Sequence, residues 1–458
     1  MKATLLLLSL CGTLLIQAAP RPNILVIVGD DMGYADVGFH GCKDIPTPHL
    51  DALAASGARF TNGYVTGPYC SPTRAGLLTG RQQTRFGHEY NPAGANGLPL
   101  TESTLPDHLK EGGYVTGMVG KWHLGSLPTQ VPQQRGFTDF YGFLGGAHSY
   151  FNAGGILRGT EQVKELDYTT DAFGREASAY IERNKGKPWF LYLAFNAVHT
   201  PMNATSERLA KFASIENKTR RTYAAMMSAM DDNVGRVIKT LKDSGQYDNT
   251  LVTFISDNGG PTMNGVTVNG SLNAPLRGSK RTTLEGGIRV PFVMAWPGHI
   301  QPAVFDPIAV QMDLHTTALA AAGVPAKEEW KLEGVNLLPY LSGEKKAPPH
   351  EALYWRFGDQ MAIRQGDWKL VRYDTNADTN KGGRQPTSGA KLYNLAADIH
   401  EDKDLAAEMP EKVKELQSRW DAWNKANVKP LWGAGAHDDD GPEPGAVPKR
   451  KGKAKAEK

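Results

Sequence analysis

The sequence has few cysteines and no excess of charge of either sign. Only 3 of its 458 residues are cysteine, which excludes a small scaffold held together by disulfides. Lys and Arg total 51 against 48 Asp and Glu, a net charge of +3 with no basic stripe, so nucleic acid is not an expected partner. Apolar residues make up 40% of the chain, which is typical of a globular protein and excludes a polytopic membrane protein.

The first residues form a segment distinct from the rest. Lys2 is followed by an apolar run from Leu5 to Ile16 and then by the small residues Ala18 and Ala19. This order is typical of a secretory signal peptide, predicted here over residues 1–19. A single membrane anchor is the alternative, but the run is shorter than the ~20 apolar residues that span a bilayer. The sequence thus predicts a secreted or periplasmic protein with no membrane span.

Largely apolar runs of strand length, with no clear alternation, recur along the first two thirds of the chain. They are Ile24–Val28, Val115–Val119, Trp189–Phe195, Leu251–Ile255 and Val290–Trp296. Such runs suit strands covered on both faces, and helical patterns at three- and four-residue spacing, as in 224–241, lie between them. The predicted fold class is α/β, with a large, mostly parallel sheet flanked by helices.

The pattern changes after a polar, Pro-rich stretch at 344–349. Beyond it come short runs and then a helical segment near 410–425, which predict a smaller C-terminal α+β domain carrying an antiparallel sheet. We therefore divide the chain into a larger α/β domain over 20–345 and a small domain over 346–435. Residues 436–458 carry many charges and almost no apolar residue, and we expect a disordered tail there.

Oxygen-bearing side chains follow two of the predicted strands. Asp30 and Asp31 come directly after one strand, and Asp257 and Asn258 after another. Because the carboxyl ends of parallel strands meet at one edge of a sheet, these groups should converge, and their oxygens suit Ca²⁺ or Mg²⁺ better than Zn²⁺. Each pair alone could equally be a turn or a helix cap.

Basic side chains and imidazoles follow the other strands and one loop. Lys121 and His123 come after the run ending at Val119, and His199 comes shortly after Phe195. Lys280 lies on a glycine-rich loop, where a solvated lysine would be the ordinary interpretation.

The segment Cys70-Ser71-Pro72-Thr73-Arg74 carries the most specific pattern. Pro72 suits the first position of a helix, which would place Cys70 at a helix N-terminus with Arg74 about one turn further on. That corner would be electropositive and suited to an anion. A buried structural cysteine is the alternative.

These motifs resemble the type I, formylglycine-dependent sulfatases of the alkaline-phosphatase-like superfamily. The resemblance runs from Pro22 to about Asn427 and rests on Cys-x-Pro-x-Arg, at 70–74, followed by Leu-Thr-Gly-Arg, at 78–81. It implies that Cys70 is converted to Cα-formylglycine by a formylglycine-generating or anaerobic maturation enzyme. It also implies one Ca²⁺, held by Asp30, Asp31, Asp257, Asn258 and the modified Cys70.

The resemblance implies roles for the remaining site residues as well. Arg74 and Lys121 would bind the sulfate, His123 would orient the formylglycine hydrate, and His199 or Lys280 would protonate the leaving oxygen. One hydroxyl of the hydrate would attack sulfur, and loss of a proton from the other would regenerate the aldehyde and expel sulfate. A further polar residue would come from the 145–150 loop, where His148 and Ser149 are both candidates for substrate binding.

The expected activity is hydrolysis of sulfate monoesters, on sulfated polysaccharides or their oligosaccharides. The 262–273 loop, with Trp296 and Trp355, could line a sugar subsite. Two alternatives stay open: a formylglycine-dependent phosphodiesterase or phosphonate monoester hydrolase, and an inactive relative that binds polyanions.

Overall fold

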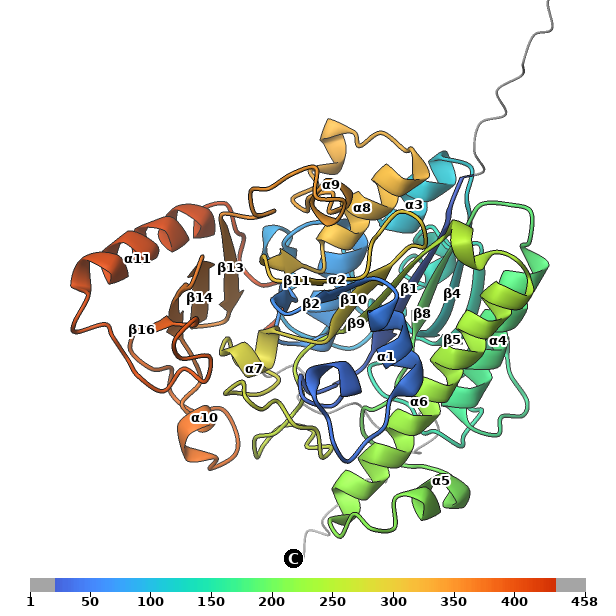
Figure 1. Ribbon diagram of the computed structural model, residues 1–458, viewed down its shortest axis with the longest axis horizontal. Coiled ribbons are helices and arrows are strands. Elements are labelled where there is room, and N and C mark those ends of the chain that lie inside the picture. Colours follow the sequence, from blue (N-terminus) through green and yellow to red (C-terminus); the bar gives the residue numbers. More distant parts are fainter. Residues whose placement is uncertain (1–20, 434–458) are drawn as a thin grey trace, which may run out of the picture.

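The computed structural model describes residues 21–433, drawn in colour in Figure 1. The predicted signal peptide, 1–19, and the predicted tail, 436–458, lie outside these residues. Within 21–433, no helix combines the length and the apolar character needed to cross a membrane.

A ten-stranded mixed sheet forms the centre of the larger domain. Its strands lie in the order β11 (Ala303–Phe305), β2 (Ala58–Phe60), β10 (Phe292–Ala295), β9 (Thr250–Ser256), β1 (Asn23–Gly29), β8 (Trp189–Ala194), β4 (Val115–Lys121), β5 (Asp139–Phe143), β6 (Leu157–Arg158) and β7 (Glu161–Gln162). A separate pair joins β3 (Gly63–Tyr64) to β12 (Ala309–Val310).

The central strands β9, β1, β8, β4 and β5 are all parallel, which confirms the predicted sheet. The run Val290–Trp296 differs, because its strand β10 is antiparallel to both β9 and β2. The physical reason is the path of the chain. Residues 257–291 stay at the carboxyl end of β9, where Lys280 contacts Asp31, so the next strand can only run back.

Helices cover both faces of the sheet (Figure 1). Alternate β1 side chains Leu25 and Ile27 pack with α1 (Pro48–Ala55), α4 (Thr169–Arg183) and α6 (Lys218–Asp243). Ile24 and Val26 face the other way, toward α2 (Cys70–Thr79), α3 (Leu105–Glu111) and α8 (Asp313–Ala322). The remaining helices of this domain are α5 (Ser206–Lys211), α7 (Glu285–Ile288) and α9 (Leu338–Leu341).

The predicted C-terminal antiparallel sheet is also present. It contains β13 (Ala352–Phe357), β14 (Gln360–Gln365), β15 (Trp368–Arg372) and β16 (Lys391–Asn394), with α10 (Asn376–Thr379) and α11 (Pro410–Asn424) around it. One face packs on the core of the larger domain through Trp355 and Val371. The other, through Ile363 and Leu370, packs with Leu416 of α11.

Helix α2 begins earlier than the sequence predicts. It starts at Cys70 itself, so Pro72 occupies the third helical position and not the first. Proline is tolerated there because the first four N–H groups of a helix have no partner within the helix. Cys70 therefore belongs to the first turn of the helix, and Arg74 lies one turn further along the same face.

A buried charge cluster joins the two domains. Lys369 of β15 contacts Glu285 Oε1 at 2.8 Å and Glu401 Oε1 at 2.9 Å, and all three side chains are fully buried. Tyr64 donates to the second oxygen of Glu285 at 2.6 Å. Burial and then the neighbouring Glu285 raise the pKa of Glu401 to about 7, against the opposing effect of Lys369. Lys369 is the cation that the two carboxyl groups share, and Glu285 is also paired with Arg289 at 3.3 Å.

We expect Lys369→Met to lower the free energy of unfolding by about 3–5 kcal/mol, because it leaves the buried Glu401 carboxyl without its cation and leaves Glu285 with Arg289 at 3.3 Å. Urea unfolding followed by circular dichroism measures the change. Lys403→Met is the matched control, since Lys403 is 70% exposed in its pair with Glu408 and should change stability by less than about 1 kcal/mol. Equal effects of the two substitutions would contradict the structural role of the cluster.

Candidate active site

Two neighbouring strands bring four oxygen-bearing residues to one edge of the sheet. Asp30 and Asp31 follow β1, Asp257 and Asn258 follow β9, and Gly29 pairs in register with Ser256. Asn258 Nδ2 donates to Asp31 Oδ1 at 2.7 Å, and the Asp31 backbone N–H donates to Asp257 Oδ1 at 3.1 Å. All four side chains are buried. The structure thus brings these predicted residues into one cluster.

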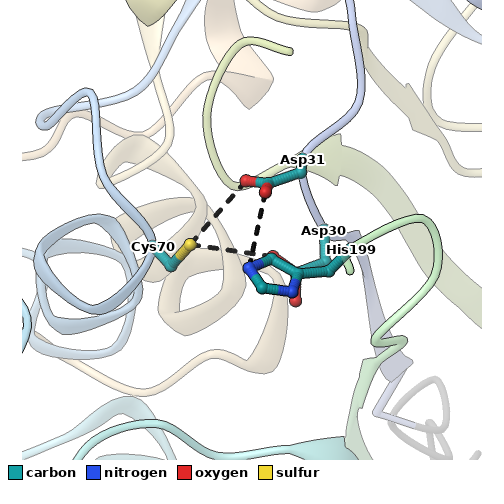
Figure 2. A group of neighbouring side chains, drawn as sticks. All are labelled: Asp30, Asp31, Cys70 and His199. Atoms are coloured by element: carbon teal, nitrogen blue, oxygen red, sulfur yellow. Dashed lines mark hydrogen bonds and ion pairs between the residues drawn. The ribbon is translucent and has the colours of Figure 1, made fainter. Parts of the chain in front are cut away.

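Cys70 faces this cluster from the first turn of α2. Its Sγ lies 3.7 Å from Asp30 Oδ1 and 3.8 Å from Asp31 Oδ1. Figure 2 shows the cysteine, both aspartates and His199 directed toward one another. Burial raises the pKa of the Cys70 thiol well above its usual value, although Lys121 and Lys280 oppose that shift. The unmodified side chain is therefore a neutral thiol and not a thiolate nucleophile.

Each buried carboxylate has a cation beside it. Arg74 Nη2 lies 2.8 Å from Asp257 Oδ2, Lys121 Nζ lies 2.6 Å from Asp30 Oδ2, and Lys280 Nζ lies 2.8 Å from Asp31 Oδ2. The residues come from three separate elements: helix α2, the end of β4 and the loop before α7. Such pairing is what permits charged groups to remain buried together.

The environments of the two adjacent aspartates differ. Burial and the neighbouring Asp257 raise the pKa of Asp30 to about 6, against the pull of Lys121. Burial alone would raise the pKa of Asp31 too, but Lys280 and His199 hold it well below the usual range. Asn258 Oδ1 is buried with no hydrogen-bond partner among the described residues. An unsatisfied oxygen beside crowded carboxylates fits a hard cation at this point.

Two histidines lie beside the cluster. His199 Nδ1 is 2.6 Å from the Thr200 carbonyl, which places a proton on that nitrogen and turns Nε2 toward Asp31, 3.5 Å away. Burial, with Lys121 the strongest of the nearby cations, lowers the pKa of His123 well below its usual value, so this ring is neutral. Ser71 Oγ donates to the His123 carbonyl at 2.6 Å and ties its backbone to helix α2.

The 145–150 loop is arranged differently from the other predicted segments. The His148 ring nitrogens lie 2.6 Å from the Ser149 carbonyl and 2.8 Å from the Gly154 carbonyl. Both nitrogens are therefore hydrogen-bonded to nearby backbone. Ser149 is half-buried. Within residues 21–433, no hydrogen bond joins either side chain to the cluster of carboxylates and cations. Substrate binding by His148 or Ser149 stays a prediction.

Loop residues that the sequence analysis did not single out also support the site. Asn269 Nδ2 donates to the Asp31 carbonyl at 3.0 Å and to the Val198 carbonyl at 2.9 Å, next to His199. Its only sequence signal is its place in the 262–273 loop. Trp355 is different: it is buried and donates to the Val65 carbonyl, so it packs in the core and the expectation that it lines a sugar subsite is wrong.

Comparisons with known proteins agree with this geometry. Residues 22–324 match the family described as "Sulfatase", and residues 278–419 match "N-sulphoglucosamine sulphohydrolase, C-terminal". The chain therefore belongs to the sulfatase family, and it is a sulfuric ester hydrolase.

Individual relatives resemble the chain over most of its length. The Homo sapiens N-acetylgalactosamine-6-sulfatase is 35% identical, over 77% of this chain and 72% of its own. The Escherichia coli (strain K12) "Uncharacterized sulfatase YdeN" is 31% identical, over 87% of this chain and 84% of its own. The crystal structure of Ps i-CgsB in complex with k-i-k-neocarrahexaose superposes with a TM-score of 0.83 at 37% identity, covering 90% of this chain and 94% of that one.

A pair of adjacent glycines tests the placement of His123. A Cβ on Gly146 would lie 2.7 Å from His123 Nε2, whereas the nearest atom to a Cβ on Gly145 would be 3.8 Å away. Neither glycine adopts the left-handed conformation, so alanine suits both backbones. We expect Gly146→Ala to lower kcat/KM on an aryl sulfate about tenfold or more by displacing the ring, with Gly145→Ala close to wild type. Wild-type activity in both variants would show that the position of the ring does not matter.

Proposed function

We propose that this protein is an exported sulfatase that hydrolyses sulfate monoesters of sulfated polysaccharides or their oligosaccharides. In this proposal Cys70 is converted to Cα-formylglycine and the site holds one Ca²⁺. The observation that carries it is the position of Cys70, within 4 Å of two aspartate oxygens in a buried cluster with three cations. A sulfate ester needs such cations, because the negative charge on its non-bridging oxygens must be neutralised before an oxygen nucleophile can approach sulfur.

The proposed Ca²⁺ ligands are Asp30, Asp31, Asp257, Asn258 and the modified Cys70. The donor set supports the choice, because its four unmodified members offer carboxylate and amide oxygens, the ligands that Ca²⁺ prefers. The unsatisfied Oδ1 of Asn258 and the raised pKa of Asp30 both fit a cation at this position. When bound, Ca²⁺ supplies positive charge that stabilises negative charge developing on nearby oxygen.

The side chains around the ligands have distinct proposed roles. Arg74 and Lys121 bind the non-bridging oxygens of the ester, and Lys280 adds a third positive charge near the same point. His199 Nε2 faces the cluster, and in the imidazolium form, with a proton on each ring nitrogen, His199 protonates the leaving oxygen from Nε2; Lys280 is the alternative donor. His123 is neutral and orients position 70 through a hydrogen bond. His148 and Ser149 remain candidates for contact with the substrate beyond the sulfate.

Relatives support a carbohydrate substrate. The Ps i-CgsB structure contains k-i-k-neocarrahexaose, and several curated relatives are named for sulfated N-acetylgalactosamine.

Export rests on the predicted signal peptide over 1–19, and the proposed partner for maturation is a formylglycine-generating or anaerobic enzyme. The proposed domains remain 20–345 and 346–435. An inactive polyanion-binding relative would not need every charged group of the cluster. Comparing sulfate with phosphate and phosphonate esters tests the phosphodiesterase alternative.

Mass spectrometry of the peptide that spans Cys70 tests the proposed nucleophile. When the protein is made in a host that contains a maturation enzyme, we expect the peptide mass to correspond to an aldehyde in place of the thiol. Cys42 is the internal control, because it lies outside a Cys-x-Pro-x-Arg motif and should stay a cysteine. An unmodified Cys70 in fully active protein would refute the proposed mechanism.

Chelation tests the metal. We expect EDTA to abolish hydrolysis of an aryl sulfate and added Ca²⁺ to restore it, because the buried carboxylates need a hard cation. The group of His49, buried Asp231 and Asp232 is the other described cluster able to hold an ion, so Asp232→Asn serves as a control and should leave the calcium dependence unchanged. Restoration by Zn²⁺ alone would contradict the ligand assignment.

Two substitutions separate proton donation from sulfate binding. We expect His199→Ala to slow sugar sulfates by about 10²- to 10⁴-fold while affecting activated aryl sulfates far less, because only the sugar alkoxide needs a proton to leave. Arg74→Ala should slow both substrate classes, since it removes charge neutralisation. The measurement is kcat/KM for each variant on both substrates. If His199→Ala slows both equally, the acid role passes to Lys280.

A further inference from the structure

The loop over residues 277–285, here the Lys280 loop, lies between the larger domain and the small C-terminal sheet. On the side of the larger domain, the Lys280 N–H donates to the Gly260 carbonyl at 3.2 Å, and the Arg281 N–H donates to the Pro68 carbonyl at 2.7 Å. Pro68 is two residues before Cys70. These bonds place the loop over the active site. The Arg281 carbonyl and the Thr283 N–H still need hydrogen-bond partners from outside the loop.

One side chain of the small sheet satisfies them. Gln360, the first residue of β14, donates from Nε2 to the Arg281 carbonyl at 2.9 Å and accepts at Oε1 from the Thr283 N–H at 3.3 Å. The same oxygen accepts from the Asp374 N–H at 3.1 Å, so the amide is held by its own domain. Because Gln360 is buried, water cannot readily replace it in these bonds.

The conformation of the loop makes this contact important. Arg281 has a φ of 72°, in the left-handed region that non-glycine residues rarely adopt. Its N–H and its carbonyl are fixed from opposite sides, by Pro68 and by Gln360. Such a conformation persists where the surroundings hold it from several directions. The preceding residue is Lys280, whose Nζ lies 2.8 Å from Asp31 and 3.5 Å from His199 Nε2.

The base of the loop is anchored to the small domain as well. Arg277 Nη1 donates to the Glu401 carbonyl at 2.8 Å, and the Glu285 N–H donates to Glu401 Oε2 at 2.8 Å. The two ends of the loop are joined by the Gly286 N–H, which donates to the Arg277 carbonyl at 2.7 Å. The base is thereby rigid, and Gln360 holds the part of the loop that projects toward the site.

We propose that Gln360 is a positioning residue for sulfate ester hydrolysis, which acts by holding the Lys280 loop so that Lys280 faces Asp31 and His199. The proposal rests on the proposed function, in which Lys280 acts on the ester. Gln360 itself touches neither the cluster nor Cys70 by any hydrogen bond found in residues 21–433. Its effect is geometric, because a displacement of about 1 Å in a charged group can cost as much as 10²-fold in rate.

The test compares two glutamines at opposite ends of β14. Gln360→Met keeps the length of the side chain and removes its three hydrogen bonds to the backbone. Gln365→Met is the matched control, because among residues 21–433 the Gln365 side chain donates only to Glu351, an exposed residue outside the Lys280 loop. Gln360→Glu is the graded variant: it keeps the accepting oxygen and loses the donor to Arg281. Each full-length protein is assayed on an aryl sulfate with Ca²⁺ present.

We expect Gln360→Met to lower kcat at least about tenfold with a smaller change in KM, and Gln360→Glu to give an intermediate loss. Bound calcium should match that of wild type, and any fall in melting temperature caused by the three lost hydrogen bonds should leave the protein folded at the assay temperature. Gln365→Met should be indistinguishable from wild type in all four quantities. If Gln360→Met does not fold, Gln360→Glu decides, and wild-type kcat in that variant would overturn the proposal.

A double-mutant cycle with Lys280→Ala distinguishes positioning from a general structural role. If Gln360 acts through Lys280, adding Gln360→Met to Lys280→Ala should reduce kcat by less than about twofold more. The same fold loss in both backgrounds would overturn the proposal, as would wild-type kcat in Gln360→Met. A wild-type protein that releases no sulfate would instead reject the proposed function.

Discussion

Three carboxylates buried at one edge of a parallel sheet are the constraint on which this structure depends. Asp30, Asp31 and Asp257 lie too close together to remain charged on their own, as the raised pKa of Asp30 indicates. One cation lies beside each carboxylate, and the three cations come from α2, from β4 and from the Lys280 loop. Because these cations come from distant parts of the sequence, the charge balance of the site also fixes how the surrounding elements are arranged.

The small C-terminal sheet supports the site, although it contributes none of the residues that form the cluster. Its Lys369 closes the charge cluster with Glu285 and Glu401, and its Gln360 holds the backbone beside Lys280. The family match "N-sulphoglucosamine sulphohydrolase, C-terminal" begins at residue 278, inside the Lys280 loop. The loop thus contacts both the carboxyl edge of the large sheet and the small C-terminal sheet.

Much of the fold and the site could be predicted from local patterns, because their causes are local. Largely apolar runs without alternation indicate strands covered on both faces, and polar residues just after such runs lie at the carboxyl edge of the sheet. The direction of β10 could not be predicted in this way, since an apolar run carries no information about direction. Nor could Gln360 or Asn269, whose roles depend on which backbone groups long-range folding leaves beside them.

The position of Cys70 within the finished fold has a consequence for the order of events during synthesis. Its side chain is 1% exposed, enclosed by carboxylates that follow β1 and β9 and by a loop that the last sheet supports. Helix α2 leaves the ribosome long before β9, the Lys280 loop and β14 do. An interval therefore exists in which the cysteine is already made and its enclosure is not. Any enzyme that must reach this side chain has its best access then.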